Sequence, residues 1–94
     1  MTKQEIVNDI SKKTGIEKIT AMATIEALMG IVKKSMTQGK NVYLRGFGTF
    51  SVVKRAKKTA RNISKNTTLI IPEHFIPKFK PSREFVQKVK IEKH

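Results

Sequence analysis

The residues best suited to chemistry in this chain form a run of cations with no acid among them. The segment from Lys54 to Lys65 contains no Asp or Glu. A surface that only keeps a protein in solution normally mixes charges of both signs. We therefore interpret the run as an anion-binding surface, with a merely solubilising run as the alternative. Its cations are Lys54, Arg55, Lys57, Lys58, Arg61 and Lys65.

The charge of the whole chain points to a polyanionic partner. The 94 residues carry a net charge of +13, and twelve of the 20 Lys and Arg residues lie in 51–94. Such an excess attracts polyanions, and nucleic acid is the usual polyanion inside a cell. An acidic membrane surface is the alternative, but that role normally uses a basic amphipathic helix, and this basic run has a strand pattern. With no apolar signal region, the chain is expected to be cytoplasmic.

No other residues form a convincing catalytic or metal site. The chain has no cysteine, and its two histidines are His74, beside Glu73, and the terminal His94, so no metal-ligand spacing exists. The segment Gly46-Phe47-Gly48 lacks the third glycine and the helix that a dinucleotide loop needs. No Ser or Thr groups with a base and an orienting acid. We expect no enzyme, no metal, no cofactor and no small-molecule substrate.

Two helices are expected at the N-terminus. Thr2 and Glu5 match a capping box and Gly15 can end a helix, which predicts a first helix over about 3–14. Apolar residues then recur at spacings of three and four up to Gly39, which predicts a second helix of roughly 20 residues. One interpretation of this wide stripe is an intramolecular core, and the other is a core that is also a dimer interface. The stripe contains Ala21, Met22, Ile25, Leu28, Met29, Ile31, Val32 and Met36.

A β-hairpin is expected after the second helix. From Val42 the apolar residues alternate with period two, which indicates a strand in which Tyr43 is expected to pack. The two close glycines of Gly46-Phe47-Gly48 predict a tight turn, and Phe50 begins the second strand.

The second strand should continue into a projecting ribbon. Between Lys54 and Arg61 the strand pattern carries mostly basic or small residues, which cannot bury a face. Turn-forming residues at 62–66 predict the tip, and the segment 67–71 is rich in β-branched residues, which predicts a return strand. Prolines follow at 72 and 77, where an edge strand tolerates them.

A short helix completes the expected α+β fold. Ser82 is a plausible N-cap, and Phe85, Val86 and Val89 form an apolar face, while Lys90–His94 are expected to fray. The predicted order is therefore a helical pair, a hairpin extended into a long two-stranded arm, and a short C-terminal helix. We predict one domain over 1–94, with a helical body at about 1–40 and 82–94 and a sheet and arm at about 41–80.

Four short motifs lie in the expected turn, strands and final junction. They are Gly46-Phe47-Gly48-Thr49-Phe50, Arg55-Ala56, Thr59-Ala60-Arg61-Asn62 and Phe79-Lys80-Pro81-Ser82. Together they are highly specific, and they resemble the signature of the bacterial HU and integration host factor family of histone-like proteins. The similarity covers nearly the whole chain without an evident gap.

The resemblance implies an intertwined homodimer or heterodimer whose β-arms enter the minor groove of double-stranded DNA and bend it, since this family is a known example of such binding. Asn62 would hold the turn at the tip. The implied dimer core includes the aromatic residues Phe47, Phe50 and Phe79, to which we add Met29 and Val32 of the second helix. The predicted DNA-binding residues are Lys3, Lys54, Arg55, Lys57, Lys58, Arg61, Asn62, Ile63, Lys65, Lys78, Lys80 and Arg83.

The chain departs from the family pattern at the tip. The family commonly has proline after the Arg-Asn pair, where this chain has Ile63. It then often has Thr-Gly, where this chain has Lys65-Asn66. Our hypothesis is that Ile63 replaces proline as an aliphatic wedge between base steps, and the alternative is an ordinary turn residue.

The sequence therefore predicts an architectural, largely sequence-nonspecific DNA-binding protein that compacts the nucleoid. The few polar groups able to bind base edges favour nonspecific binding. RNA binding, and sequence-specific bending of the kind found in integration host factor, are the alternatives.

Overall fold

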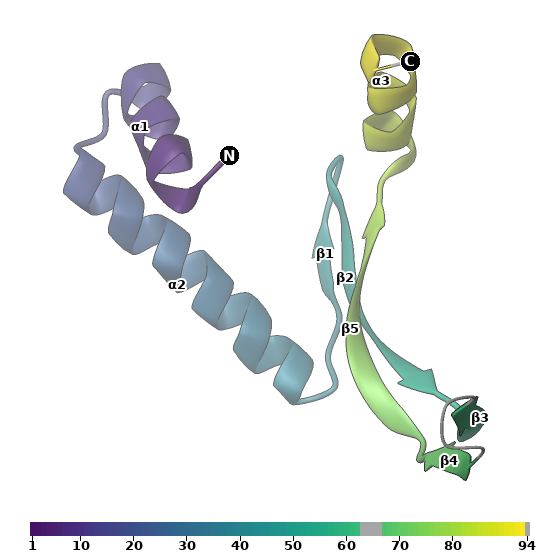
Figure 1. Cartoon of the computed structure of the whole chain (residues 1–94). Helices are drawn as coiled ribbons and strands as arrows, with labels where there is room; N and C mark the ends of the chain where they lie inside the picture. The colour runs from purple at the N-terminus through teal and green to yellow at the C-terminus, as the bar shows by residue number, and fades with distance from the viewer. Residues whose placement is uncertain (63–66, 94) are drawn as a thin grey trace. The chain divides into compact units, whose positions relative to one another are not determined.

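The computed structural model describes residues 1–62 and 67–93, with side chains for 1–59 and 68–92. Two helices are followed by five strands and a third helix, so the predicted α+β order is confirmed (Figure 1). The elements are α1 (Lys3–Thr14), α2 (Lys18–Thr37), β1 (Val42–Leu44), β2 (Gly48–Arg55), β3 (Lys58–Asn62), β4 (Thr67–Ile71), β5 (His74–Pro81) and α3 (Arg83–Lys93).

The chain forms two compact units, Met1–Ser35 and Met36–His94. In the first unit the predicted start and end of α1 are confirmed. The Thr2 hydroxyl accepts a hydrogen bond from the Glu5 backbone N–H at 3.2 Å, which satisfies one free donor of the first turn. Gly15 ends the helix in the left-handed region, with φ of 80°, a conformation that costs glycine little.

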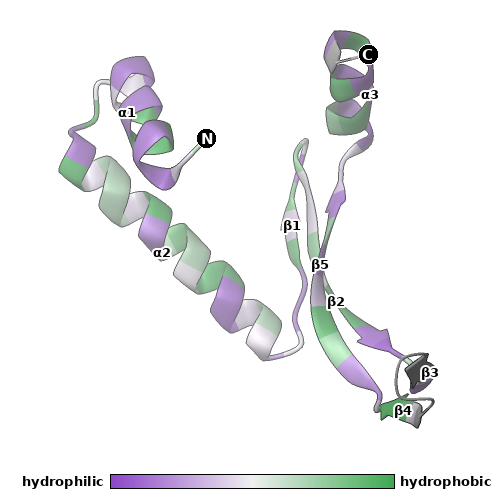
Figure 2. Cartoon of the chain, in the orientation of Figure 1, coloured by the Kyte–Doolittle hydropathy of each residue, from purple (hydrophilic) through white to green (hydrophobic). Residues whose placement is uncertain are grey.

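The apolar stripe of α2 is only partly covered within one chain. Ala21 of the stripe is buried, as is Val7 of α1, but Leu28, Met29 and Ile31 are 44%, 40% and 66% exposed. Figure 2 shows apolar residues recurring along α2. An intramolecular core therefore accounts for only part of the stripe. Among the described residues, no helix has the length and apolarity needed to cross a membrane.

The second unit is built on a three-stranded antiparallel sheet in the order β1-β2-β5. The Phe47 backbone N–H donates to the Leu44 carbonyl at 2.9 Å, and Gly46 has a φ of 83°. These two features close the predicted tight turn between β1 and β2. Because β5 is an edge strand, Pro77 removes no ladder bond from the centre of the sheet.

The ribbon is interrupted rather than continuous. Pairing of β2 with β5 ends at Arg55 opposite His74, and pairing of β3 with β4 begins at Lys58 opposite Ile71. Two residues on each strand, 56–57 and 72–73, lie outside the ladders. Pro72 has no N–H to donate, which is a physical reason for the break. β3 and β4 form a separate two-stranded sheet at the end of the ribbon (Figure 1).

Ser82 fixes the start of α3 on the hairpin turn. Its hydroxyl accepts from the Phe85 N–H at 3.2 Å and donates to the Gly46 carbonyl at 2.9 Å, while its own N–H donates to the Phe47 carbonyl at 2.8 Å. The predicted N-cap is confirmed. α3 continues to Lys93, and the expected fraying from Lys90 stays a prediction.

Candidate nucleic-acid interface

The two faces of the sheet differ in chemistry. Residues paired directly across an antiparallel ladder share a face, and successive residues of a strand alternate between faces. The register therefore assigns one set of residues to what we call the basic face: Tyr43, Thr49, Ser51, Val53, Arg55, His74, Ile76, Lys78 and Lys80. The opposite, aromatic face carries Val42, Leu44, Phe50, Val52, Phe75 and Phe79, together with Lys54 near its end.

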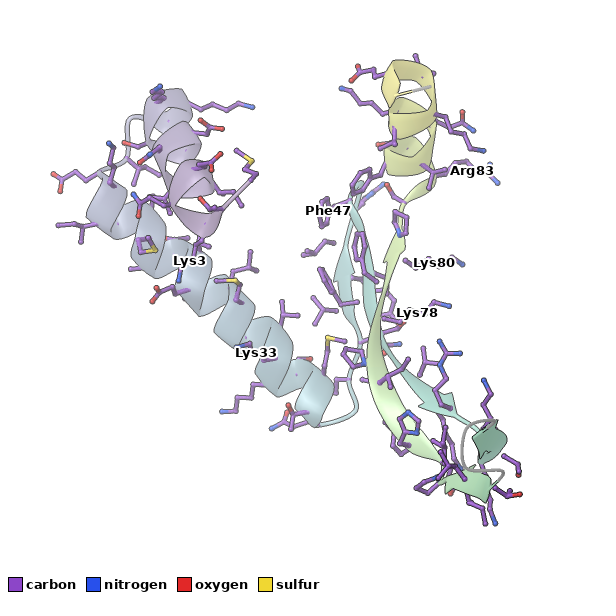
Figure 3. All side chains as sticks on the ribbon, in the orientation of Figure 1. Lys3, Lys33, Phe47, Lys78, Lys80 and Arg83 are labelled. Atoms are coloured by element: carbon purple, nitrogen blue, oxygen red, sulfur yellow. The ribbon has the colours of Figure 1, made fainter. Side chains whose placement is uncertain are left out.

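The cations of the basic face are aligned and open to solvent. Lys78 and Lys80 are two residues apart on β5, which places them about 6.8 Å apart along the strand. Figure 3 shows both side chains extending to the same side as Arg83, the first residue of α3, with Phe47 on the other side. All three cations are exposed. The structure thus brings together three of the predicted DNA-binding residues.

Two further predicted cations are held by carboxylates. Lys3 lies in the first unit, where its Nζ is 3.1 Å from Glu26 Oε1 on α2. The Nζ of Lys54 lies 3.3 Å from Glu73 Oε2. All four side chains are about half exposed, and such ion pairs contribute about 0–1 kcal/mol, so a phosphate can replace the carboxylate. Nothing in the sequence indicated either pair, because each acid is far along the chain from its lysine.

The remaining predicted arm residues follow the ribbon toward its tip. Arg55 ends β2, Lys57 lies in the break, and Lys58 begins β3, all with exposed side chains. The backbones of Arg61 and Asn62 pair with Thr68 and Thr67 in β3 and β4. The side chains of Arg61 and Asn62, and the whole of Ile63 and Lys65, lie outside the described part of the chain, so their roles stay predictions.

The predicted aromatic core forms a cluster within one chain. The Phe79 ring centroid lies 4.8 Å from that of Phe50 and 5.2 Å from that of Phe47. Phe85 of α3 stacks on Phe47 at 5.3 Å, which sequence analysis did not anticipate. Phe47 nevertheless remains 46% exposed.

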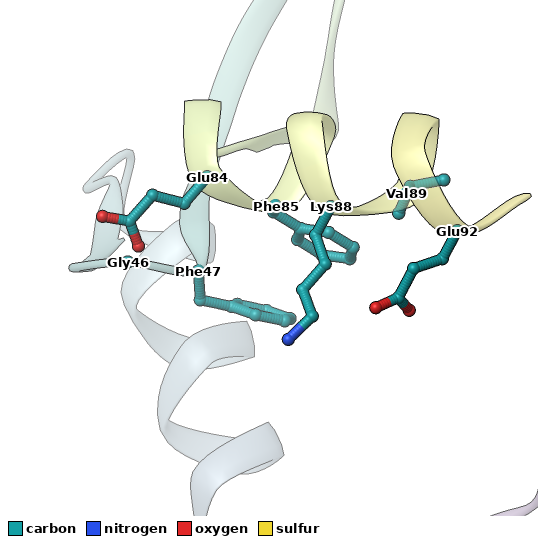
Figure 4. A pocket seen from close by; sticks show the side chains of 7 residues that line it. All are labelled: Gly46, Phe47, Glu84, Phe85, Lys88, Val89 and Glu92. Atoms are coloured by element: carbon teal, nitrogen blue, oxygen red, sulfur yellow. The ribbon is translucent and has the colours of Figure 1, made fainter.

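Phe47 opens onto a pocket of about 360 Å³ beside α3 (Figure 4). In the first unit, Met29 is 40% exposed and Val32 is half-buried. The predicted dimer-core residues are therefore only partly covered by their own chain. The pocket is lined by Gly46, Phe47, Glu84, Phe85, Lys88, Val89 and Glu92.

Arg45 and Tyr43 are functional candidates that sequence analysis missed. Both line an open pocket that Lys80 and Arg83 also line, so Arg45 adds a cation to the basic side of the sheet. The expectation that Tyr43 packs is wrong, because its side chain is 73% exposed on the basic face. The sequence contained a signal for this position. Tyr43 alternates with the apolar residues Val42 and Leu44, so its side chain lies on the opposite face of the strand.

The described residues contain no group of three His, Asp or Glu side chains that could hold a metal ion. What this surface can do is bind an extended anion through lysine and arginine side chains. Phosphates along a nucleic-acid backbone are anions of that kind.

A family model and two sequence relatives match nearly the whole chain. A family model described as bacterial DNA-binding protein matches residues 1–90. DNA-binding protein HU of Thermotoga maritima is 32% identical over 90 residues, which cover 96% of this chain and 100% of that protein. Integration host factor subunit beta of Marinobacter nauticus is 33% identical over 90 residues, covering 95% and 92%.

A solved structure agrees with these relatives. A cocrystal structure of Anabaena HU with DNA aligns with a TM-score of 0.86 at 28% identity and covers 100% of both chains. The family match, the sequence relatives and the fold all extend over nearly the full chain. This chain therefore belongs to the bacterial DNA-binding protein family that contains HU and integration host factor.

Proposed function

We propose that this chain is an architectural protein that binds double-stranded DNA through its backbone, bends it and compacts the nucleoid with little sequence preference. One observation carries the proposal: the cations Arg55, Lys78 and Lys80 share one face of the sheet, while the phenylalanine side chains of β2 and β5 share the other. The related Anabaena HU was crystallised with DNA.

Charge and geometry support backbone contact. Duplex DNA carries one negative charge per about 1.7 Å of its axis, and cations that neutralise phosphates release condensed counterions. The exposed cations of β5 and α3, and those at the start of the arm, offer such contacts along an extended surface. Contacts between lysine and phosphate hold a protein in place on DNA but carry no sequence information. They therefore favour nonspecific binding.

The proposal includes assembly of two chains. The side chains of Leu28, Ile31 and Phe47 are 44%, 66% and 46% exposed, and such apolar surface is unusual for a monomer of 94 residues. A second copy of the chain would cover the stripe of α2 and the pocket beside Phe47. A heterodimer with a paralogue would do the same.

The proposal keeps Ile63 as the wedge at the tip of the arm. An aliphatic side chain inserted between base steps unstacks them and kinks the duplex. Ile63→Ala should therefore reduce the bend angle measured by energy transfer between dyes at the two ends of a duplex. Bending equal to that of the unchanged protein would contradict the wedge.

The proposed activity is binding without catalysis, at the bacterial nucleoid.

Substitution on the basic face tests the proposal. Lys78→Ala and Lys80→Ala should each weaken duplex binding to a similar degree on unrelated sequences, because each removes a phosphate contact. The log–log slope of affinity against salt should fall by about 0.9 for each lysine removed. Fluorescence anisotropy of a labelled duplex across a salt series measures both quantities.

Lys13→Ala is the matched control, because it removes one exposed lysine from the last turn of α1, outside the predicted site. Its effect should be clearly smaller than that of either sheet lysine. Equal losses from all three variants would mean that only net charge matters and would contradict the proposed surface. Preference for an RNA duplex of the same sequence would favour the RNA-binding alternative.

A further inference from the structure

A small pocket lies where the three-stranded sheet meets the arm. It has a volume of about 260 Å³ and lies between the end of β2, the start of β3, the end of β4 and the start of β5. Arg55 and His74 are direct cross-strand partners at its edge, and Lys58 approaches from β3. The lining residues are Arg55, Ala56, Lys58, Ile71, His74 and Ile76.

The imidazole of His74 contacts the backbone of the neighbouring break in the ribbon. Its Nδ1 lies 3.0 Å from the carbonyl oxygen of Pro72. A carbonyl oxygen can only accept, so Nδ1 carries the hydrogen and donates it in this contact. Nε2 is then an acceptor when the ring is neutral and a donor when the ring is protonated. Protonation thus changes what His74 offers to an anion.

The charges around His74 favour an anion. Arg55 and Lys58 line the same pocket, no acid is among its lining residues, and Lys57 lies in the adjoining break. Glu73, the residue before His74, is the acid closest in sequence, and its carboxylate lies 3.3 Å from the Lys54 ammonium. A phosphate here would meet two permanent cations and one side chain that can become a third.

We propose that this pocket binds a backbone phosphate of DNA and that His74 takes up a proton when it does so. The inference rests on the proposed function and adds a site and a pH dependence to it. The phosphate stabilises the protonated ring, because Nε2–H donates to it and the charges attract. Binding therefore strengthens as pH falls, because the protonated ring adds a donor and a charge to the site.

The test compares duplex binding from pH 8.0 to pH 5.5 at constant ionic strength. The unchanged protein should bind about three- to tenfold more tightly at the lower pH, the range expected for one linked proton. His74→Gln should lose this change. His74→Lys should bind tightly at every pH, because its charge is permanent.

His94→Gln is the control, because it removes the only other histidine of the chain. It should keep the full pH dependence. If His74→Gln keeps the pH dependence of the unchanged protein, or if the unchanged protein has none, the phosphate site at His74 is wrong while DNA binding stands. If the unchanged protein fails to bind duplex DNA at every pH, the proposed function itself is wrong. Circular dichroism of each variant verifies that it is folded.

Discussion

At the scale of single residues, the two glycines of Gly46-Phe47-Gly48 have different roles. Gly46 has a positive φ, which the turn requires. Gly48 is buried and sits against β5, where an added Cβ would lie 2.6 Å from the Lys80 carbonyl oxygen and 2.6 Å from the Phe79 ring. The spacing of the two glycines predicts that both are turn residues. The second one instead allows the backbone of β2 to approach the aromatic cluster.

Gly48→Ala should therefore destabilise the protein by about 1–3 kcal/mol, because backbone and a packed ring must move to admit the methyl group. Denaturant unfolding at a fixed protein concentration measures the change. Ser51→Ala is the control on the same strand, since its side chain faces the other way, and it should cost less than about 0.5 kcal/mol. A Gly48→Ala variant as stable as Ser51→Ala would disprove the close approach.

At the scale of elements, the sequence predicted the helix ends that a single local capping interaction determines. Thr2 and Gly15 bound α1, and Ser82 starts α3, because capping involves residues within one turn of each other. The break in the ribbon was not predicted, since a proline in an edge strand does not by itself show where pairing with the partner strand stops. The exposed position of Tyr43 and the pairing of Lys3 with Glu26 likewise depend on contacts between elements.

Ser82 makes two hydrogen bonds that position α3, because its one hydroxyl caps the helix and also binds the Gly46 carbonyl. Ser82→Ala should cost about 1–2 kcal/mol of unfolding free energy. Ser82→Thr keeps the hydroxyl and should recover most of that stability. Thermal unfolding followed by circular dichroism distinguishes the two variants. Equal stability of Ser82→Ala and the unchanged protein would contradict the double role.

At the scale of the whole molecule, the described part of one chain buries very little. Val7 and Ala21 are its only buried apolar side chains, and a single buried valine contributes about 1.5–3 kcal/mol. A chain of this size needs more apolar burial than that for an independent fold. The exposed stripe of α2 supplies the missing surface once a second copy covers it.

Met29→Asp tests that assembly, because it places a carboxylate in the stripe where the second copy would pack. Sedimentation equilibrium should give twice the chain mass of 10.7 kDa for the unchanged protein and a lower average mass, or unfolded chain, for the variant. Met29→Leu, of similar volume, should remain dimeric. A folded monomer of the unchanged protein at micromolar concentration would be incompatible with the proposed dimer.

The central claim is that this chain tracks the DNA backbone. The most direct measurement is the salt dependence of its binding to several short duplexes of unrelated sequence, followed by fluorescence anisotropy. The account predicts a steep log–log slope equivalent to several released counterions and nearly the same for every sequence. A shallow slope, or no binding at moderate salt, would mean that the basic face and arm serve another partner.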